Sequence, residues 1–198
     1  VCNVDPANIT TVRPDGSTYH TYIVDTATGE GLVGKTHQGL SDQSCWARGQ
    51  AWGIYGFALA YRHTHAKRFR DVALALARYF LDRLPADGIC PWDLDLGGDP
   101  RQERDSSAAA IAACGLLELS GLLDVADPNR AALCGPATAM LNTLSAHYLN
   151  TTPDEDGILR GGTYHRPQGI GVNECCLWGD YFYTEALARR HTAAPSFW

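Results

Sequence analysis

The stretch SCWARGQAWGIYGFALAYR, residues 44–62, has the pattern of a long α-helix that neighbours cover on more than one side. Ser44 precedes the apolar run, where a side chain that caps the helix N-terminus is expected. Small and aromatic residues are spread over several faces of this helix: Trp46, Gly49, Trp52, Gly53 and Gly56. Such a helix is typical of the inner layer of a helical assembly, so we expect it to be packed all round.

Helical patterns continue beyond this segment. Residues 67–84 place apolar residues on one face: Phe69, Val72, Ala73, Leu76 and Phe80. Three more helices are predicted, over 106–123, about 130–149 and 177–190. Asp105 or Ser106 starts the first of these, and Asp127 followed by Pro128 suits the start of the second. Pro136 predicts a kink or a later start in that second helix.

The connections between helices share a signature. Asp-Gly precedes a short extended, aromatic stretch at Asp15, at Asp87 and at Asp156, with intervals of 72 and 69 residues. Each interval holds loop, helix, loop and helix, so the repeating unit is a helical hairpin with a long loop. Because one hairpin cannot bury its apolar face alone, stacked hairpins must continue as a solenoid or close into a ring.

We therefore predict an all-α fold, an (α/α)6 barrel in which six hairpins close into a ring. Six pairs of helices need roughly twice the length of this chain, so we expect residues 1–198 to be part of a single α/α-barrel domain.

Composition narrows the class of partner. The chain has 198 residues, 45% of them hydrophobic, and a formal net charge of −6, as expected for an ordinary globular protein. Its longest basic cluster is KRFR at 67–70, which makes nucleic acid or an anionic membrane an unexpected partner. The seven cysteines show no C-x-x-C spacing, so we expect free thiols, no metal site and no cofactor. Free thiols favour a cytoplasmic location, with secretion as the alternative.

One short motif points elsewhere. GEGLVGKT, residues 29–36, matches the phosphate-binding pattern G-x-x-x-x-G-K-[ST]. That loop requires a strand running into the first glycine and a helix starting at the Lys-Thr pair. The extended run ends at Asp25, and loop residues follow Thr36, so we expect a glycine-rich surface loop and no nucleotide.

Arg48 and Trp52 lie four residues apart and share one face of the first helix. A guanidinium can hold a carboxylate by two charge-assisted hydrogen bonds, and an indole offers a flat face to a sugar ring. The pair therefore suits a carboxylated sugar. The alternative is structural: Arg48 pairs with a loop acid such as Asp42, and Trp52 belongs to the core.

The stretch SDQSCWARGQAWGIYGFALAYR, residues 41–62, resembles the signature of the unsaturated glucuronyl hydrolases, glycoside hydrolase family 88. The resemblance continues through RDSSAAAIAACGLLEL at 104–119 and GDYFYTEAL at 179–187, in the family's order. It implies an (α/α)6 barrel, of which this chain looks like the C-terminal half.

The resemblance also implies a reaction. Members of the family hydrate the C4=C5 double bond of an unsaturated uronyl oligosaccharide: an aspartic acid protonates C4, water adds at C5, and the hemiketal collapses to release the shortened saccharide. The aspartates assigned to this chemistry are expected upstream, so no catalytic residue is expected in this chain. The matching positions imply that substrate is bound by His20, Gln38, Arg48 and Trp52.

Two other classes of protein stay open. The first is the related unsaturated rhamnogalacturonyl hydrolases. Their corresponding helix typically reads WGRGNGW, whereas this chain has Gln50 and Ala51 there. A carbohydrate-binding or interaction module without catalysis is the second alternative. The loop at 159–174 is expected to meet the leaving saccharide, with Arg160, His165 and Arg166 available for its sulfate or carboxylate groups; simple solvent exposure is the alternative. Trp92 lies in the equivalent loop one repeat earlier and could line the pocket, or it could pack within its own loop. The oligomeric state is not predicted.

Overall fold

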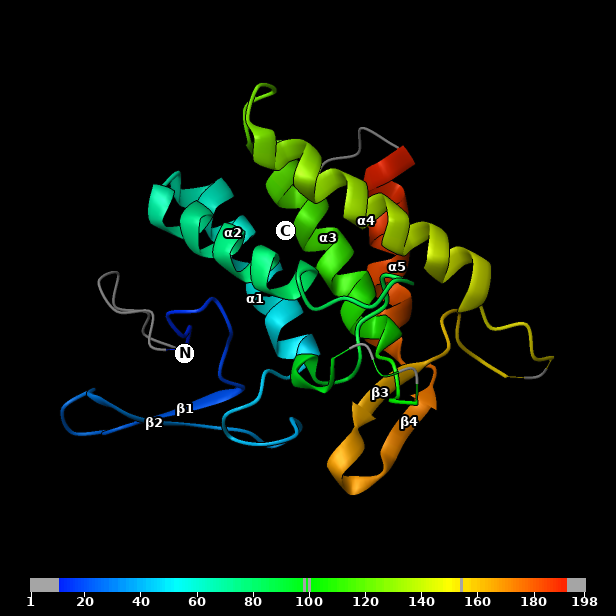
Figure 1. Cartoon of the computed structure of the whole chain (residues 1–198), viewed down its shortest axis with the longest axis horizontal. Coiled ribbons are helices and arrows are strands. Elements are labelled where there is room, and N and C mark those ends of the chain that lie inside the picture. The colour runs from blue at the N-terminus through cyan, green and yellow to red at the C-terminus, as the bar shows by residue number, and fades with distance from the viewer. Residues whose placement is uncertain (1–10, 98, 100, 154, 192–198) are drawn as a thin grey trace.

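The computed structural model describes residues 11–97, 99, 101–153 and 155–191. Within them, five α-helices lie beside two antiparallel hairpins (Figure 1). The helices are α1 (Ala47–Thr64), α2 (Lys67–Leu81), α3 (Ser106–Leu122), α4 (Pro128–His147) and α5 (Leu177–His191). The hairpins are β1 (Thr21–Val24) with β2 (Gly31–Lys35), and β3 (Gly162–His165) with β4 (Ile170–Glu174). Short 3-10 turns span Leu94–Leu96 and Arg166–Gln168. The fold is mainly helical, as predicted, but the two small sheets make it not purely all-α.

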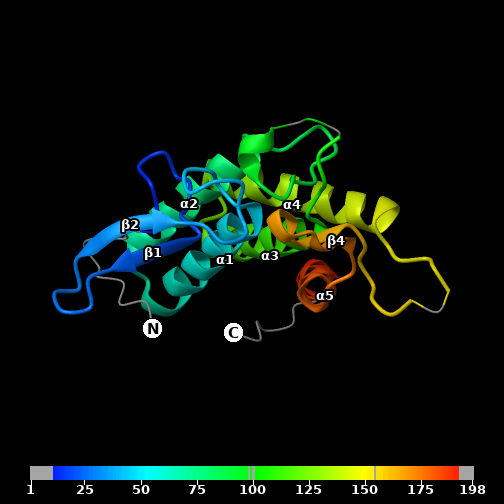
Figure 2. The same cartoon turned by 90° about the horizontal axis from the view of Figure 1, so that it is seen from below.

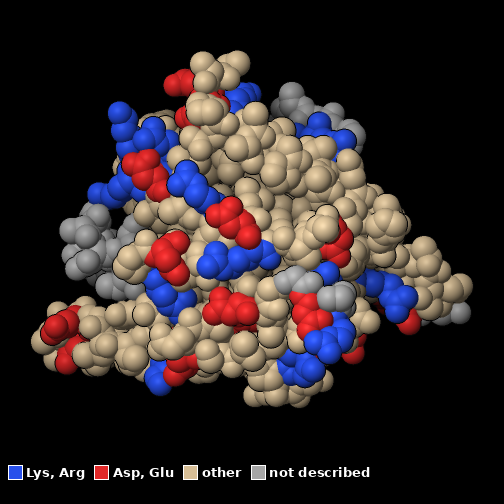
Figure 3. All heavy atoms as spheres, viewed as in Figure 1, with Lys and Arg blue, Asp and Glu red and all other residues tan. Residues whose placement is uncertain are grey.

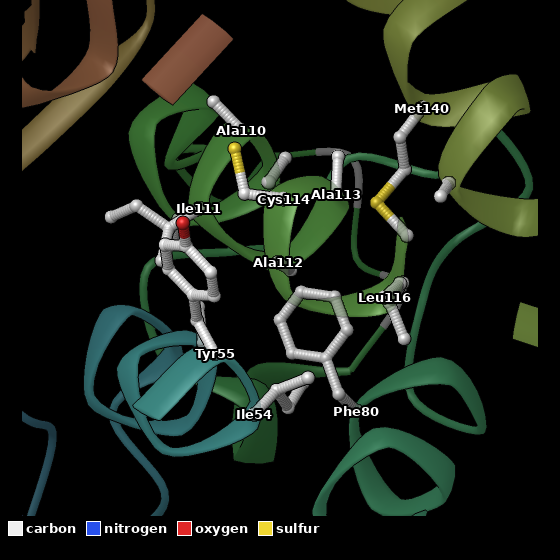
Figure 4. Packing of buried hydrophobic residues seen from close by; sticks show 14 of the residues in the cluster. Ile54, Tyr55, Phe80, Ala110, Ile111, Ala112, Ala113, Cys114, Leu116 and Met140 are labelled. Carbon is white, nitrogen blue, oxygen red and sulfur yellow. The ribbon is translucent and has the colours of Figure 1, made fainter. Parts of the chain in front are cut away.

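Helix α3 lies at the centre of the core. It packs against α1, α4 and α5, and α2 packs on α1. Fourteen of its 17 residues are buried, because its run of alanines lets neighbouring helices approach on every side. Figure 4 shows Phe80 of α2 pointing into the space between Ile54 of α1, Leu116 of α3 and Met140 of α4. The helix packed all round is therefore α3.

Helix α1 differs from its prediction in this respect. Trp52 is 38% exposed, and a Cβ at Gly56 would meet nothing within 4 Å among the described residues. One face of α1 is thus uncovered in the part of the chain that the structure describes, and a first helix covered on all sides stays a prediction for the complete ring.

Two helices begin at the capping residue that was predicted for them, and one does not. The Asp105 carboxylate accepts the Ala108 backbone N–H, and Asp127 accepts that of Asn129. Helix α4 begins at Pro128 and continues through Pro136, which excludes the later start. The Ser44 prediction is wrong: α1 begins at Ala47, without a side-chain cap.

The repeated Asp-Gly turns have a common conformation. Gly16, Gly88 and Gly157 have φ angles of 87°, 75° and 107°, in the region that glycine adopts most readily. The first and third turns lead to the hairpins β1–β2 and β3–β4, whereas the second leads to the 3-10 turn at Leu94–Leu96. Figures 1 and 2 place both hairpins at the end of the helices where α1, α3 and α5 begin. The loops therefore bring distant parts of the chain to one end of the helical layer.

The face of the molecule drawn in Figure 3 has no large patch of charges of one sign. Lysine and arginine alternate there with aspartate and glutamate (Figure 3). None of the helices in the described ranges has the length and apolarity needed to cross a membrane. The six described cysteines are free thiols, three of them buried, and Cys2 lies outside the described residues.

Candidate functional site

The side chain of Arg48 lies in the first turn of α1 and is 4% exposed. Its Nη1 donates to Asp105 Oδ2 at 2.6 Å and to the Thr163 carbonyl at 2.7 Å. Its Nη2 donates to the Tyr164 carbonyl at 2.7 Å. Arg48 thus has an acidic partner, as the structural alternative expected, but that partner is Asp105. The Asp42 named as an example pairs instead with Lys35.

Aromatic rings surround the Arg48 guanidinium. Its central carbon lies 4.6 Å from the ring centroid of Trp46, 5.4 Å from Trp178 and 6.0 Å from Tyr164. These distances are within the range of cation–π attraction. Tyr164 and Trp178 are 5.5 Å apart, and the Tyr164 side chain is exposed. The N-terminal end of α1 therefore carries a cation set among flat apolar surfaces that come from three elements.

Gln38 joins this group through a long-range contact. Its Nε2 donates to the Tyr164 carbonyl at 2.7 Å, so Gln38 and Arg48 converge on one backbone oxygen. The loop that carries Gln38 is fixed by Asp93, whose Oδ2 accepts the Leu40 N–H at 2.9 Å and the Ser44 hydroxyl at 2.7 Å. Burial raises the pKa of Asp93 above its usual value.

His20 lies next to the same loop. Its ring is 4.2 Å from that of Trp46, and its Nδ1 accepts the backbone N–H groups of His37 and Gln38 at 3.2 and 3.3 Å. These bonds assign the proton of the neutral ring to Nε2. Burial, and then the charges of His37, Arg48 and His165, lowers the pKa of His20 to about 4. His20 is therefore a neutral donor near pH 7.

Trp52 is separate from this cluster. Its ring packs edge-to-face on Phe182 of α5 at 4.9 Å, and it is exposed rather than part of the core. The structure thus brings together His20, Gln38 and Arg48, with Trp46 between His20 and Arg48, and leaves Trp52 on the surface one turn along α1. An exposed indole can still offer a face to a sugar ring.

Sequence reasoning missed Tyr164 and Trp178 as members of the site. A signal for Tyr164 was present, because the triplet Thr-Tyr-His occurs at 18–20 and again at 163–165, in the corresponding loops of two repeats. The first triplet contains the predicted His20. No comparable local signal marks Trp178 as a neighbour of Arg48.

The loop at 159–174 forms one side of a shallow pocket. A space of about 410 Å³ is lined by Leu40, Trp92, Leu96, Gln102, Arg166 and Pro167. Trp92 therefore lines a pocket, although 5% exposure shows that most of its ring is packed. Arg166 pairs with Glu103 at 3.0 Å, and Arg160 donates to Thr152 at 3.4 Å. Of the predicted contacts to a leaving saccharide, Arg166 is the one that lines this pocket.

Asp93 and Asp105 are buried beside the site, and each accepts hydrogen bonds from the protein at both carboxylate oxygens. Asp105 accepts from Arg48 and Ser107, and Asp93 accepts from Leu40, Ser44 and Asp95. Both side chains are fully buried in the described structure. Neither is placed to protonate a ligand atom directly. Within the described residues, no group of three or more His, Cys, Asp or Glu is arranged to hold a metal ion.

The nucleotide-like octapeptide is not the glycine-rich surface loop that was predicted, because residues 31–35 form the strand β2. Bends follow at 37–40, and the next helix begins only at Ala47. Lys35 bonds Asp42 at 2.8 Å. The segment therefore lacks the helix N-terminus that a phosphate-binding loop requires.

The fold of helical hairpins resembles that of solved carbohydrate-active hydrolases. No family model matches the chain. It is 43% identical over 188 residues to the unsaturated glucuronyl hydrolase of a Bacillus species, and 42% identical over 189 residues to the unsaturated chondroitin disaccharide hydrolase of Streptococcus pneumoniae.

Solved structures agree with these sequence matches. The unsaturated glucuronyl hydrolase of the Bacillus species superposes with a TM-score of 0.88 at 44% identity, over 91% of this chain and 48% of that one. An Asp-to-Asn variant of the Streptococcus agalactiae enzyme, solved in complex with dGlcA-GalNAc6S, has a TM-score of 0.86 at 40% identity, over 96% of this chain and 50% of that one.

The chain is thus homologous to the unsaturated glucuronyl hydrolases, which confirms the predicted resemblance. The two curated matches cover 94% of this chain but only 50% and 48% of the relatives. The chain therefore spans about half the length of the curated relatives it matches.

Proposed function

We propose that this chain is part of an unsaturated glucuronyl hydrolase, an enzyme that hydrates the C4=C5 double bond of unsaturated glucuronyl oligosaccharides. The observation that carries the proposal is the 43% identity over 94% of the chain to a hydrolase of that name. The names of the relatives favour this family over the unsaturated rhamnogalacturonyl hydrolases, and they point to glycosaminoglycan disaccharides as the class of substrate.

The complete protein on this proposal is a single (α/α)6 barrel, and residues 1–198 are its C-terminal half. The placement of the inner helices supports this. Helices α1 and α5 both pack on α3, and their side chains also meet, as Trp52 does with Phe182. Figure 1 shows the two β-hairpins at the end where all three helices begin. A ring of such hairpins would surround one pocket with side chains from these N-terminal ends. Free thiols in the described residues fit a cytoplasmic location.

Within the pocket, this chain supplies the binding side. The rings of Trp46, Tyr164 and Trp178 offer apolar faces to a pyranose, and neutral His20 offers the Nε2 proton to a sugar oxygen. Gln38 donates one amide hydrogen to Tyr164 and keeps a second hydrogen for a ligand. The acid that protonates C4 is supplied by the rest of the enzyme, because Asp93 and Asp105 are both committed to bonds within the protein.

The test uses the full-length protein and the isolated 198-residue chain in parallel. Each is incubated with an unsaturated glucuronyl disaccharide, and the ultraviolet absorbance of the conjugated double bond is followed. We expect absorbance to fall with the full-length protein and to stay constant with the isolated chain. No loss of absorbance with folded full-length protein would favour a carbohydrate-binding module without catalysis. Turnover by the isolated chain would show that its own carboxylates supply the acid.

A further inference from the structure

Asp105 connects three parts of the site that are far apart in the sequence. It lies at the N-cap of α3, between the loop at 84–105 and the central helix. Its Oδ2 accepts Arg48 Nη1 at 2.6 Å, and its Oδ1 accepts the Ser107 hydroxyl at 2.5 Å. Its Oδ1 also lies 3.4 Å from the Thr163 N–H of β3. One buried carboxylate therefore contacts α1, α3 and the β3–β4 hairpin.

The contact with Ser107 extends to an aromatic wall of the site. Trp178 Nε1 donates to Ser107 Oγ at 3.1 Å. An indole nitrogen can only donate, so the Ser107 oxygen accepts there and uses its own hydrogen for Asp105. The direction of both bonds follows: Trp178 to Ser107, and Ser107 to Asp105. The acceptor-only carboxylate at the end of this chain fixes the indole of α5 in place.

The same carboxylate fixes the cation. Arg48 Nη1 donates to Asp105 and to the Thr163 carbonyl, and it also lies 3.4 Å from Ser107 Oγ. These contacts hold the plane of the guanidinium against the hairpin. With its central carbon 5.4 Å from the Trp178 ring, a small rotation of either group changes the surface that a sugar would meet. The side chain of Asp105 has no exposed area, so it acts through these partners and does not contact the substrate.

We propose that Asp105 is a positioning residue, which sets the orientation of Arg48 directly and of Trp178 through Ser107, and so defines the sugar-binding surface. Its role in catalysis rests on the proposed function, because it requires that a saccharide bind at this end of the helices. The helix cap that Asp105 also provides is a separate contribution, since Asn caps a helix almost as well as Asp. Substitution by Asn therefore distinguishes the two roles.

In Asp105→Asn, the amide group must face either Arg48 or Ser107. If the NH2 group of the Asn side chain faces Arg48, two hydrogen-bond donors face each other. If the NH2 group faces Ser107, it offers a hydrogen where the hydroxyl needs an acceptor, and the helix cap is kept only in the other orientation, because Oδ1 accepts both Ser107 and the Ala108 N–H. In both orientations the Arg48 charge loses its counter-ion. Either arrangement releases one of the two oriented groups. Asp127→Asn is the matched control, because Asp127 caps the outer helix α4 by the same type of bond.

The first experiment measures kinetics of the full-length protein well below the melting temperature of each variant. We expect Asp105→Asn to lose at least tenfold in kcat/KM, mainly through KM, and Asp127→Asn to match the wild type. Combining Asp105→Asn with Trp178→Phe should cost less than the product of the two separate losses, because both act on one surface. Unchanged kcat and KM in folded Asp105→Asn, with only a lower melting temperature, would overturn the proposal.

The second experiment does not depend on activity. Tryptophan fluorescence is compared between wild type and Asp105→Asn, and the comparison is repeated in a Trp178→Phe background. A change of emission that disappears without Trp178 supports the orientation chain even if the protein proves to hydrolyse no unsaturated disaccharide. Identical spectra in the first comparison would contradict it. Lack of wild-type activity alone would count against the proposed function only.

Discussion

Gly115 in the middle of α3 lies directly against the backbone of α1. A Cβ built there would lie 2.8 Å from the Tyr55 nitrogen and 2.9 Å from its Cα. Backbone atoms cannot rotate away, so in Gly115→Ala α1 and α3 must separate by several tenths of an ångström. Separating packed helices in this way costs about 1–3 kcal/mol, against which alanine gains about 1 kcal/mol in helix propensity. The difference leaves a net destabilisation of up to about 2 kcal/mol.

The control is Gly121→Ala, six residues further along the same helix, where an added Cβ meets no described atom within 4 Å. Only the propensity term acts there, so the substitution should be neutral or stabilise by up to about 1 kcal/mol. The two variants make the same chemical change in one helix and should move stability in opposite directions.

Thermal unfolding followed by circular dichroism separates the two cases. For a chain of this size, about 1 kcal/mol corresponds to a shift in Tm of about 2–4 °C, so Gly115→Ala should melt below the wild type, by up to about 8 °C. Equal melting temperatures for the two variants would show that α1 and α3 do not pack at the distance described. Urea unfolding gives an independent value of the free energy difference.

Three further predictions concern the site and the nucleotide-like loop. Arg48→Lys keeps the charge but loses the planar group that bonds Asp105 and the two carbonyls. The kcat/KM of the full-length protein should therefore fall at least tenfold, which corresponds to about 1.4 kcal/mol. Unchanged kinetics would leave Arg48 without a role in binding. The pKa of about 4 for His20 lies below its unfolded value, so its contribution to stability is present above about pH 6.5 and is lost as the pH falls towards 4. The full pKa shift corresponds to about 3 kcal/mol, which solvent screening of this half-buried ring reduces to about 1 kcal/mol. Urea unfolding at pH 7 and at pH 4.5 should show this loss of about 1 kcal/mol from His20 in the wild type, and His20→Asn should lack it. Mg-ATP should not raise Tm at any concentration, because the segment at 29–36 has no helix to bind phosphate; a concentration-dependent rise would refute this.

Local patterns predicted the helices and most of their starts. The caps at Asp105 and Asp127 and the Asp-Gly turns depend on residues within three positions of one another, so their chemistry is readable from the sequence. The Ser44 prediction failed because α1 begins only at Ala47, and the Ser44 hydroxyl is used within the preceding loop: it accepts the Ser41 N–H and donates to Asp93, 49 residues away. A serine that can cap a helix can equally bond a buried carboxylate, and the sequence does not distinguish the two.

The binding roles of His20, Gln38, Arg48 and Trp52 stay predictions, but the contacts among the first three could not have been read from the sequence. The bonds that hold them in one region span the chain: Gln38 reaches a carbonyl 126 residues away, and Arg48 reaches an acid 57 residues away. Helical spacing placed Arg48 and Trp52 on one face, but it could not show that neighbours would cover the first and leave the second exposed. Such pairings depend on how the hairpins stack.

The burial of Arg48 changes how a carboxylated sugar would be recognised. A guanidinium binds a carboxylate in two parallel bonds when the edge formed by Nη1 and Nη2 is open. Here both hydrogens of Nη1, and one of Nη2, are directed at Asp105 and at the Thr163 and Tyr164 carbonyls. That edge faces the protein, and Asp105 balances the charge. A substrate carboxylate therefore gains little from a direct fork, and recognition passes to donors that are neutral and still free to point outward, above all His20 Nε2. On this reasoning Arg48 contributes to binding mainly by holding the hairpin and the aromatic rings in place, which is why its loss and the loss of Asp105 should impair the same step.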